Sequence, residues 1–229
     1  SDKLLTVLFE HRGKLSVWAK GAKRLKSPLF ASAQPFIYGN FTIFENKGRF
    51  MLDGGEVLAS FYGLRKDITK LALGNYIAEL CYLLTDENMP EDDILRLALN
   101  CLYAISEKDA DANKTKAVFE LRAMAECGFM PELSECIECG CENGAFLFDA
   151  EKGGTICDCS KDSCRVENVF LLSEALLSLL KYIVSCEPSK VLSFKTDEIT
   201  LSIFEKLAER YLLCRIDTNP KTLEFYKGL

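Results

Sequence analysis

Cysteines are the residues of this 229-residue chain whose types and spacing are most specific for chemistry. A C-x2-C pair, Cys136 and Cys139, is followed directly by Gly140, and more cysteines come after 17 intervening residues. Thiolates at this spacing can surround one tetrahedral zinc ion, and a glycine lets the backbone amides turn back toward the second sulfur. We therefore expect a zinc site whose four ligands are Cys136, Cys139, Cys157 and Cys159.

The second cysteine pair is one residue shorter than the usual spacing, because Ser160 stands where a C-x2-C pair has its second thiol. The spacing leaves Cys164 open as an alternative fourth ligand, with Cys141 as a remoter candidate. Four protein ligands leave no position for water, so a zinc ion here would be structural and not catalytic. The alternative to a zinc site is a group of reduced, packed cysteines. An iron–sulfur cluster fits this segment less well, because the ligands of such clusters have other spacings.

Basic side chains form the second group of interest. Between positions 12 and 27 the chain has six Lys and Arg residues and no acid, and the densest part leads from a predicted strand into a loop. Flexible cations on a loop can follow a phosphate backbone without reading its sequence. The alternative is a solvated loop that binds nothing. The predicted DNA contacts are Arg12, Lys14, Lys20, Lys23, Arg24, Lys26 and Arg49.

Aromatic residues near this basic segment can offer stacking surfaces to nucleic-acid bases. Aromatic residues that alternate along strands usually fill the core, so we expect only one or two of them on a base-stacking face. The candidates are Trp18, Phe30, Phe36, Tyr38, Phe41 and Phe44.

Catalytic groupings are scarce in the sequence. His11 is the only histidine and falls in a predicted turn, where periodicity places no Ser or Cys beside it. The chain has no glycine-rich phosphate loop of the GxxxxGK[ST] kind. Glu91, Asp92 and Asp93 indicate the N-terminus of a helix, where the macrodipole favours acids, more than a metal site. We therefore expect a protein that is not an enzyme.

The elements that position these residues change in type near position 56. Residues 1–56 alternate with period two between turns, which fits a small antiparallel barrel better than a sandwich, although a five-stranded barrel would need one more strand than the sequence shows. Residues 57–229 predict a helical domain, interrupted at about 131–165 by a Gly- and Cys-rich zinc module. The expected class is α+β, with an N-terminal β-barrel followed by an all-helical domain.

Turn residues and helical periodicity place the boundaries of these elements. We expect a break at Gly54–Gly55, helical spacing from about Glu56, a cap at Asp67 or Thr69, and stops at Pro188 and Pro220. Further helices are predicted at about 92–106, 113–127, 173–185 and 198–216.

The net charge of −6 hides a division along the chain. Residues 1–50 hold nine bases and three acids, a balance of +6, which leaves −12 for the other 179 residues. A basic segment joined to an acidic body can still hold phosphates on one face. The sequence has no apolar run long enough to span a membrane and no signal pattern at Ser1, so we expect no membrane partner and a cytoplasmic, nucleoid-associated protein.

In combination, several segments resemble the RecO family of bacterial DNA repair proteins, and the resemblance covers nearly the whole chain. The cysteine pair Cys136 and Cys139 resembles the start of that family's cysteine module. The other matching segments are LLTVL at 4–8, KGAKRLKS at 20–27, QPF at 34–36, LRKD at 64–67, YIAEL at 76–80, FELR at 119–122, GFMPEL at 128–133, GG at 153–154 and KTLEF at 221–225.

The resemblance implies that residues 1–56 form an OB-fold β-barrel that binds DNA, that a helical domain with a zinc module follows, and that the protein has no enzymatic activity. It implies binding to single- and double-stranded DNA, strand annealing, and work with RecR and single-stranded DNA-binding protein to load recombinase. The family has a further strand before Leu4, which we do not find here, so we expect either an open barrel or a sequence that is truncated at this end. We expect the C-terminal tail of single-stranded DNA-binding protein to meet Lys181, Lys206 and Arg210. The alternative function is a zinc-containing protein-interaction module that does not bind DNA directly.

Overall fold

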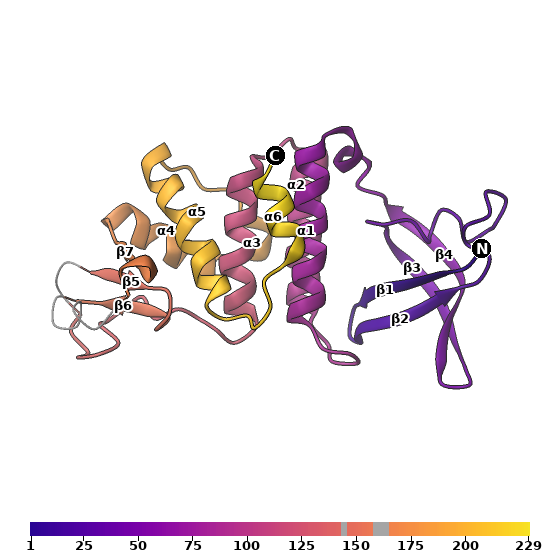
Figure 1. Ribbon diagram of the computed structural model, residues 1–229, viewed down its shortest axis with the longest axis horizontal. Helices are drawn as coiled ribbons and strands as arrows, with labels where there is room; N and C mark the ends of the chain where they lie inside the picture. The colour runs from indigo at the N-terminus through magenta and orange to yellow at the C-terminus, as the bar shows by residue number, and fades with distance from the viewer. Residues whose placement is uncertain (143–145, 158–164) are drawn as a thin grey trace. The chain divides into compact units, whose positions relative to one another are not determined.

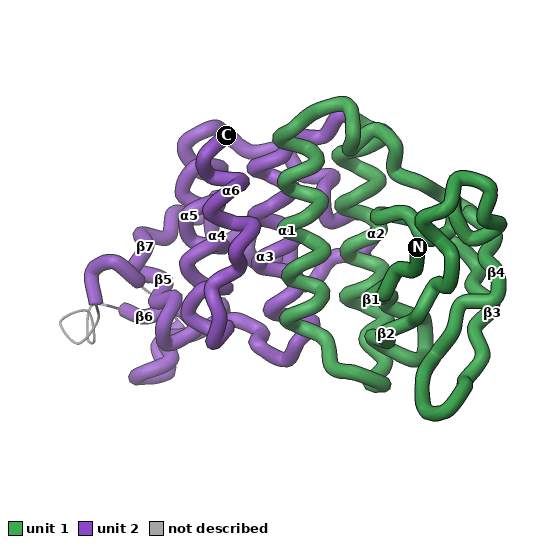
Figure 2. The backbone as a smooth tube through the Cα atoms, turned by 45° about the vertical axis from the view of Figure 1, so that its right-hand side comes forward, with its two compact units in different colours: residues 1–108 green, residues 109–229 purple. Residues whose placement is uncertain are grey.

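The computed structural model describes residues 1–142, 146–157 and 165–229. The chain divides into two compact units, residues 1–108 and residues 109–229 (Figure 2). Both units combine strands and helices, so the expected α+β class is confirmed (Figure 1). Among the described helices, none has the length and apolar character that crossing a membrane requires.

Unit 1 begins with a four-stranded sheet in the order β1-β2-β4-β3. β1 and β2 form one antiparallel hairpin, β3 and β4 form a second, and β2 joins them by a short parallel pairing with β4. Each hairpin turn uses left-handed backbone, at His11 and Gly13 in the first and at Lys47 and Gly48 in the second. The strands are β1 (Lys3–Phe9), β2 (Gly13–Ala19), β3 (Tyr38–Asn46) and β4 (Arg49–Ala59).

The inner face of this sheet holds an apolar core, as the alternation in the sequence predicts. Leu15, Val17 and Ala19 on β2 are buried, whereas Ser16 and Trp18 between them are exposed. Leu29, Ala33 and Leu52 belong to the same core cluster. Burial of one face fixes the register, because a slip by one residue would turn this apolar set to solvent. Closure of the sheet into an OB-fold barrel stays a prediction.

The expected break at Gly54–Gly55 and the helical spacing from Glu56 are wrong. β4 continues to Ala59, because Gly54 to Ala59 pair with β3 down to Tyr38. A bulge in this pairing accommodates an extra residue instead of ending the strand. Three helical segments then complete unit 1, and the carboxylate of Asp67 caps the second, as predicted. They are η1 (Tyr62–Lys66), α1 (Ile68–Leu84) and α2 (Asp92–Glu107).

The described residues of unit 2 form four α-helices and a small sheet of order β6-β5-β7, so the expectation of an all-helical domain is wrong: its third strand, Val169–Leu171, lies outside the predicted zinc module and pairs with β5. Asp111, Ser173 and Asp197 cap three of its helices through their side chains. The helices before Pro188 and Pro220 end at Ser185 and Leu213, as predicted, and Pro220 also precedes a further short helix that was not predicted. The elements are α3 (Ala112–Glu126), β5 (Leu147–Asp149), β6 (Gly154–Ile156), η3 (Val166–Asn168), β7 (Val169–Leu171), α4 (Glu174–Ser185), η4 (Pro188–Lys190), α5 (Glu198–Leu213) and α6 (Lys221–Lys227).

Helix α3 lies at the centre of unit 2, since its residues from Thr115 to Ala125 are buried without interruption. Its buried charges are paired. The ammonium of Lys116 contacts Glu120 at 2.8 Å and Glu209 on α5 at 2.7 Å, and Glu209 also binds Lys227 of α6 at 2.7 Å. This ion-pair network connects three helices. The predicted boundary at 56/57 separates strand-rich from helix-rich sequence and stays a prediction, whereas the compact units meet at 108/109.

Candidate metal centre and nucleic-acid interface

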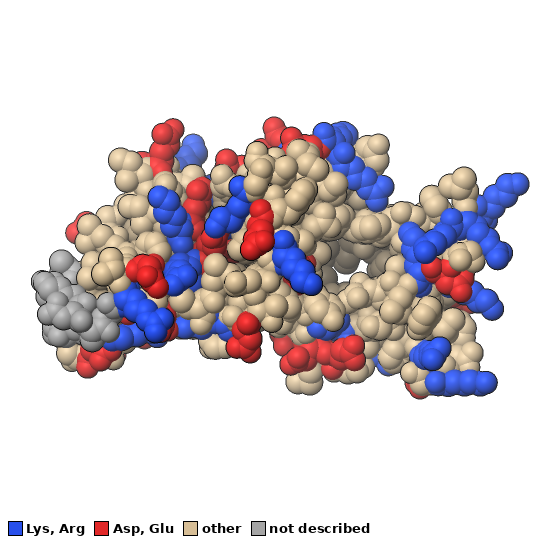
Figure 3. Space-filling model, in the orientation of Figure 1, with Lys and Arg blue, Asp and Glu red and all other residues tan. Residues whose placement is uncertain are grey.

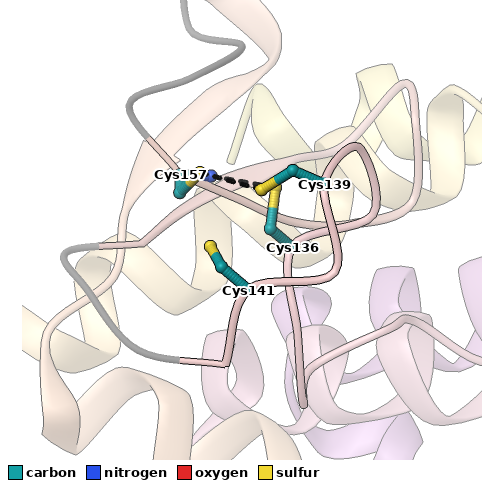
Figure 4. A group of neighbouring side chains, drawn as sticks. All are labelled: Cys136, Cys139, Cys141 and Cys157. Carbon is teal, nitrogen blue, oxygen red and sulfur yellow. Dashed lines mark hydrogen bonds between the residues drawn. The ribbon is translucent and has the colours of Figure 1, made fainter.

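Four cysteine sulfurs converge in unit 2 beside β6 (Figure 4). The sulfur atoms of Cys136, Cys139, Cys141 and Cys157 all lie within 4.8 Å of one another. A tetrahedral ion with Zn–S distances of about 2.3 Å holds its sulfurs about 3.8 Å apart, so this group has suitable donors at suitable separations. The four cysteines can therefore hold a metal ion. Of the predicted ligands, Cys159 lies outside the described residues, as does the alternative Cys164.

Backbone hydrogen bonds fold the cysteine loop around the buried sulfur of Cys136. The amide of Gly140 donates to the Cys136 carbonyl at 2.8 Å, and the Cys136 amide donates to the Cys141 carbonyl at 2.9 Å. Gly140 has a φ of +70°, a left-handed conformation that favours glycine. The tight turn returns Cys141 toward Cys136 and places a fourth sulfur in the group. The C-G-C continuation after Cys139 was the sequence signal for this position.

Electrostatics at Cys136 favour the thiolate that a metal requires. Burial by itself would raise the pKa of Cys136, but hydrogen bonds from the amides of Glu138, Cys139 and Cys157 outweigh it and lower the pKa to about 6. The pKa of Cys141 is raised, chiefly by its hydrogen bond with Cys157. Amide donors that stabilise one anionic sulfur are typical of a site that receives a cation.

The cysteine loop is attached to the small sheet through β6. The amide of Ile137 donates to the Thr155 carbonyl at 2.9 Å, and the Thr155 hydroxyl donates to the Glu135 carbonyl. The amide of Thr155 also donates to the Glu132 carbonyl at 2.8 Å. A metal bound by the four cysteines would therefore connect this loop to the start of the segment that follows β6.

The predicted DNA contacts lie in unit 1, and most of them are exposed. Lys20, Lys23, Arg24 and Lys26 lie in the loop after β2 with exposed side chains. The amide of Lys23 donates to the Ser1 carbonyl at 2.9 Å, which holds the backbone of this loop against the N-terminus. Figure 3 shows Lys and Arg side chains gathered over the N-terminal sheet, with a small group of acids among them.

Lys14 and Arg12 make contacts within unit 1. The Lys14 ammonium donates to the carbonyls of Tyr82 and Thr85, both at 2.6 Å, and lies 4.1 Å from the centre of the Tyr82 ring. Those carbonyls are at the C-terminal end of α1, so Lys14 neutralises the negative end of that helix. The Arg12 guanidinium lies 5.2 Å from the Phe50 ring centre and is exposed. Arg49, at the start of β4, is also exposed.

Three of the six candidate aromatic residues are exposed. Trp18 and Phe44 lie on the outer face of the sheet, and Tyr38 lies at the start of β3. Phe41 packs on the core, with its ring 6.3 Å from that of Phe9. Phe30 and Phe36 are half-buried. Three of the six aromatic residues therefore lie in or against the interior, and three are exposed, although we expected most of them to be in the interior.

The remaining candidates have other partners. His11 Nδ1 lies 2.5 Å from a carboxylate oxygen of Asp92, and the His11 amide donates to the other oxygen at 2.7 Å. That amide is the main cause of the lowered pKa of Asp92. Asp92 and Asp93 lie in the first turn of α2, which confirms the helix N-terminus. Arg210 donates to the Asn168 side chain at 2.5 Å, whereas Lys181 and Lys206 are both exposed.

Comparisons with known proteins agree with these features. The family described as recombination protein O N terminal matches residues 1–61, and the one described as recombination protein O C terminal matches residues 65–224. A DNA repair protein RecO from Acetivibrio thermocellus is 32% identical over 230 residues, with 100% of this chain and 91% of the relative covered. The RecO of Alkaliphilus metalliredigens is 26% identical, with 100% and 93% covered.

A sheet-bearing N-terminal unit with exposed bases, joined to a helical unit with a cysteine cluster, defines an α+β protein of the DNA repair class. The chain belongs to the RecO family. The resemblance seen in the sequence is therefore confirmed.

Proposed function

We propose that this chain is a recombination mediator that binds single- and double-stranded DNA and anneals complementary strands. It would also help to load recombinase onto single-stranded DNA covered by single-stranded DNA-binding protein. The observation that supports this proposal most is the exposed basic loop on the N-terminal sheet. The residues outside 1–50, by contrast, carry a net charge of −12. We assign the DNA contacts to Lys20, Lys23, Arg24, Lys26 and Arg49, with Arg12 at their edge.

Cations on this loop would bind DNA by releasing the counterions condensed on its phosphates. Such contacts are weak singly and sensitive to salt, so two bound strands can still slide past one another in search of register. The acidic body would repel DNA and confine it to the basic face. Lys14 is excluded from this assignment, because its ammonium is held by the carbonyls of Tyr82 and Thr85.

The four-cysteine group would hold a structural zinc ion. Its donors are all sulfur, which suits zinc, and four protein ligands leave no open position for a reacting water. The ligands we propose are Cys136, Cys139, Cys141 and Cys157. The ion would stabilise the cysteine loop and β6 and would take no part in a reaction. The protein would accordingly act as a mediator and not as an enzyme.

Partners of the mediator would be RecR and the acidic C-terminal tail of single-stranded DNA-binding protein. For the tail, Lys181 and Lys206 both have exposed side chains, whereas Arg210 is already bound by Asn168. We therefore rank Lys181 and Lys206 equally, and ahead of Arg210, among the contacts expected from the sequence.

Annealing of labelled complementary strands tests the proposed function. The chain should accelerate annealing, and a Lys23→Glu, Arg24→Glu variant should lose most of the acceleration, because it replaces two phosphate contacts with repulsive charges. A Lys181→Glu, Lys195→Glu variant, with the same charge change at exposed positions of unit 2, is the control and should anneal normally. Equal annealing by all three proteins would contradict the proposed DNA face.

The second candidate function is a zinc-containing protein-interaction module that does not bind DNA directly. The balance of −12 outside residues 1–50 favours it, because most of the chain would repel nucleic acid. Absence of DNA binding at low salt, with the metal in place, would select this function.

A further inference from the structure

Two of the four clustered cysteines have sulfur atoms within reach of each other (Figure 4). The Sγ atoms of Cys139 and Cys157 lie 3.5 Å apart and share a hydrogen bond. A disulfide holds its two sulfurs about 2.05 Å apart, so an approach of about 1.5 Å would bring these atoms to bonding distance. Small movements of the two side chains are enough for such an approach, and no rearrangement of the strands is needed.

Backbone hydrogen bonds hold both sides of this pair in place. The amide of Ile137, two residues before Cys139, donates at 2.9 Å to the carbonyl of Thr155, which is two residues before Cys157. The amide of Thr155 donates to the Glu132 carbonyl at 2.8 Å, so β6 is also attached to the segment that enters the cysteine loop. These bonds join backbone to backbone. They therefore keep the two sulfurs close whether or not a metal is bound.

The four sulfurs differ in how easily an oxidant can reach them. Cys139 is exposed, whereas Cys136 is only 1% exposed. Cys141 and Cys157 are half-buried. Oxidation of cysteine follows thiolate character and exposure, and a metal ligand is held as a thiolate, so the first attack is expected at Cys139. Cys157 then lies where a second thiolate can react with the oxidised sulfur.

We propose that Cys139 and Cys157 are an oxidation site, at which hydrogen peroxide forms a disulfide and the zinc ion is released. The Cys139 thiolate attacks one peroxide oxygen and the O–O bond breaks, which gives a sulfenic acid and a hydroxide that takes up a proton to become water. The Cys157 thiolate then attacks the sulfenic sulfur, the S–S bond forms, and the S–O bond breaks to release a second hydroxide, which also becomes water. In total, the two thiolates lose two electrons, and one peroxide with two protons becomes two waters.

The disulfide would take over the cross-link that the metal provides. Of the proposed ligands only Cys136 and Cys141 would remain as thiolates, which is too few for a structural zinc ion. The disulfide joins the same two segments as the ion, the cysteine loop and the residue after β6, and 17 residues lie between its ends. A cross-link over such a loop stabilises the fold by restricting the unfolded chain. The inference rests on the proposed zinc site and adds to it a response to oxidation.

Titration of the zinc-loaded full chain with hydrogen peroxide tests the inference. Peptide mass spectrometry, after the remaining thiols have been alkylated, should find a disulfide between Cys139 and Cys157. A chromogenic chelator should detect released zinc in an amount equal to that disulfide and with the same time course. Dithiothreitol followed by added zinc should restore the starting state. A disulfide between any other two cysteines, or a sulfinic acid at Cys139 without a disulfide, would overturn the inference.

Variants separate the roles of the two sulfurs, and they are compared as metal-free chains because loss of a ligand also weakens zinc binding. Cys139→Ser should form disulfide about tenfold more slowly than the wild type, because the exposed sulfur is missing. Cys157→Ser should accumulate the sulfenic acid at Cys139, which dimedone traps. Cys186→Ser, at a half-buried cysteine outside the group, is the matched control and should form the disulfide at the wild-type rate. A wild-type rate in Cys139→Ser would also overturn the inference.

The outcomes separate this inference from the proposed zinc site. A chain that binds no zinc but forms this disulfide would reject the metal and support the oxidation site. A chain that keeps both its zinc and its thiols in the same peroxide would support the metal and reject the oxidation site. Thermal unfolding measures the cross-link itself, since the oxidised chain should unfold several degrees above the same metal-free chain after reduction.

Discussion

Cys141 completes the sulfur group, although the spacing of the sequence favoured Cys159 for that position. The difference arises because spacing counts residues, whereas the fourth sulfur is set by the turn at Gly140 and by the hydrogen bond from the Cys136 amide to the Cys141 carbonyl. Such a turn is visible only once the loop has folded onto β6.

We predict that Cys141→Ser removes most of the bound zinc. Loss of one of four thiolates lowers affinity steeply, because structural zinc depends on a complete ligand set. Zinc content and competition with a chelator measure this on the purified chain. Cys186→Ser, at a cysteine outside the group, should retain full zinc. Full zinc in Cys141→Ser together with loss in Cys159→Ser would assign the fourth ligand to Cys159 instead.

Glu209 should stabilise unit 2 in a pH-dependent way. Burial alone would raise its pKa, but hydrogen bonds from Lys116 and Lys227 outweigh burial and lower the pKa below its usual range. A lowered pKa in the folded state means that the stabilisation is present above about pH 4.3 and is lost as the pH falls through the folded pKa.

We therefore predict that Glu209→Gln lowers the free energy of unfolding by about 1–3 kcal/mol at neutral pH. The difference from the wild type should shrink as the pH falls toward about 3. Urea unfolding across this range measures it, with Glu198→Gln, an exposed acid at the start of the same helix, as control. A difference independent of pH would show that the lost interaction is not ionic.

At the scale of elements, Lys14 lies in the basic segment of the sequence but stabilises the fold by a contact between a strand and a helix. Helix α1 has no basic residue in its own last turn, and Lys14 from β2 supplies the missing cation through the Tyr82 and Thr85 carbonyls. This contact holds the first hairpin against α1.

We expect Lys14→Met to lower the free energy of unfolding by about 1–2 kcal/mol, because two carbonyls lose a charged donor. The dependence of DNA affinity on salt should stay as in the wild type. Lys20→Met, which removes an exposed charge, should do the reverse. Urea unfolding and DNA titration of both variants would decide, and a reduced salt dependence in Lys14→Met would return this residue to the DNA face.

The sequence predicts most elements of the fold but not their pairing. Apolar periodicity and caps locate α2 to α5 within three residues at each end, because those signals are local. The length of β4 depends on its pairing with β3, which no local signal contains. The same holds for Leu4, Trp18, Met51 and Phe44 on the outer face of the sheet, because they become neighbours only through strand register.

In the whole molecule, the proposed metal site and the proposed DNA contacts lie in different units, so the effect of metal removal on stability can be measured separately from its effect on DNA binding. The cysteine group lies within residues 109–229, and the proposed DNA contacts lie within residues 1–108. We predict that removal of zinc by a chelator lowers the thermal stability of the chain while its affinity for single-stranded DNA changes less than about threefold. A large loss of DNA affinity in the zinc-free chain would show instead that the metal supports the DNA face.

The central claim is that the basic loop neutralises DNA phosphates, and the salt dependence of single-stranded DNA binding tests it most directly. Neutralising two contacts in a Lys23→Ala, Arg24→Ala variant should make the slope of log affinity against log salt shallower by about 1.4. A Lys181→Ala, Lys195→Ala variant should keep the wild-type slope. Identical slopes for all three proteins, or no binding by the wild type at low salt, would contradict the account.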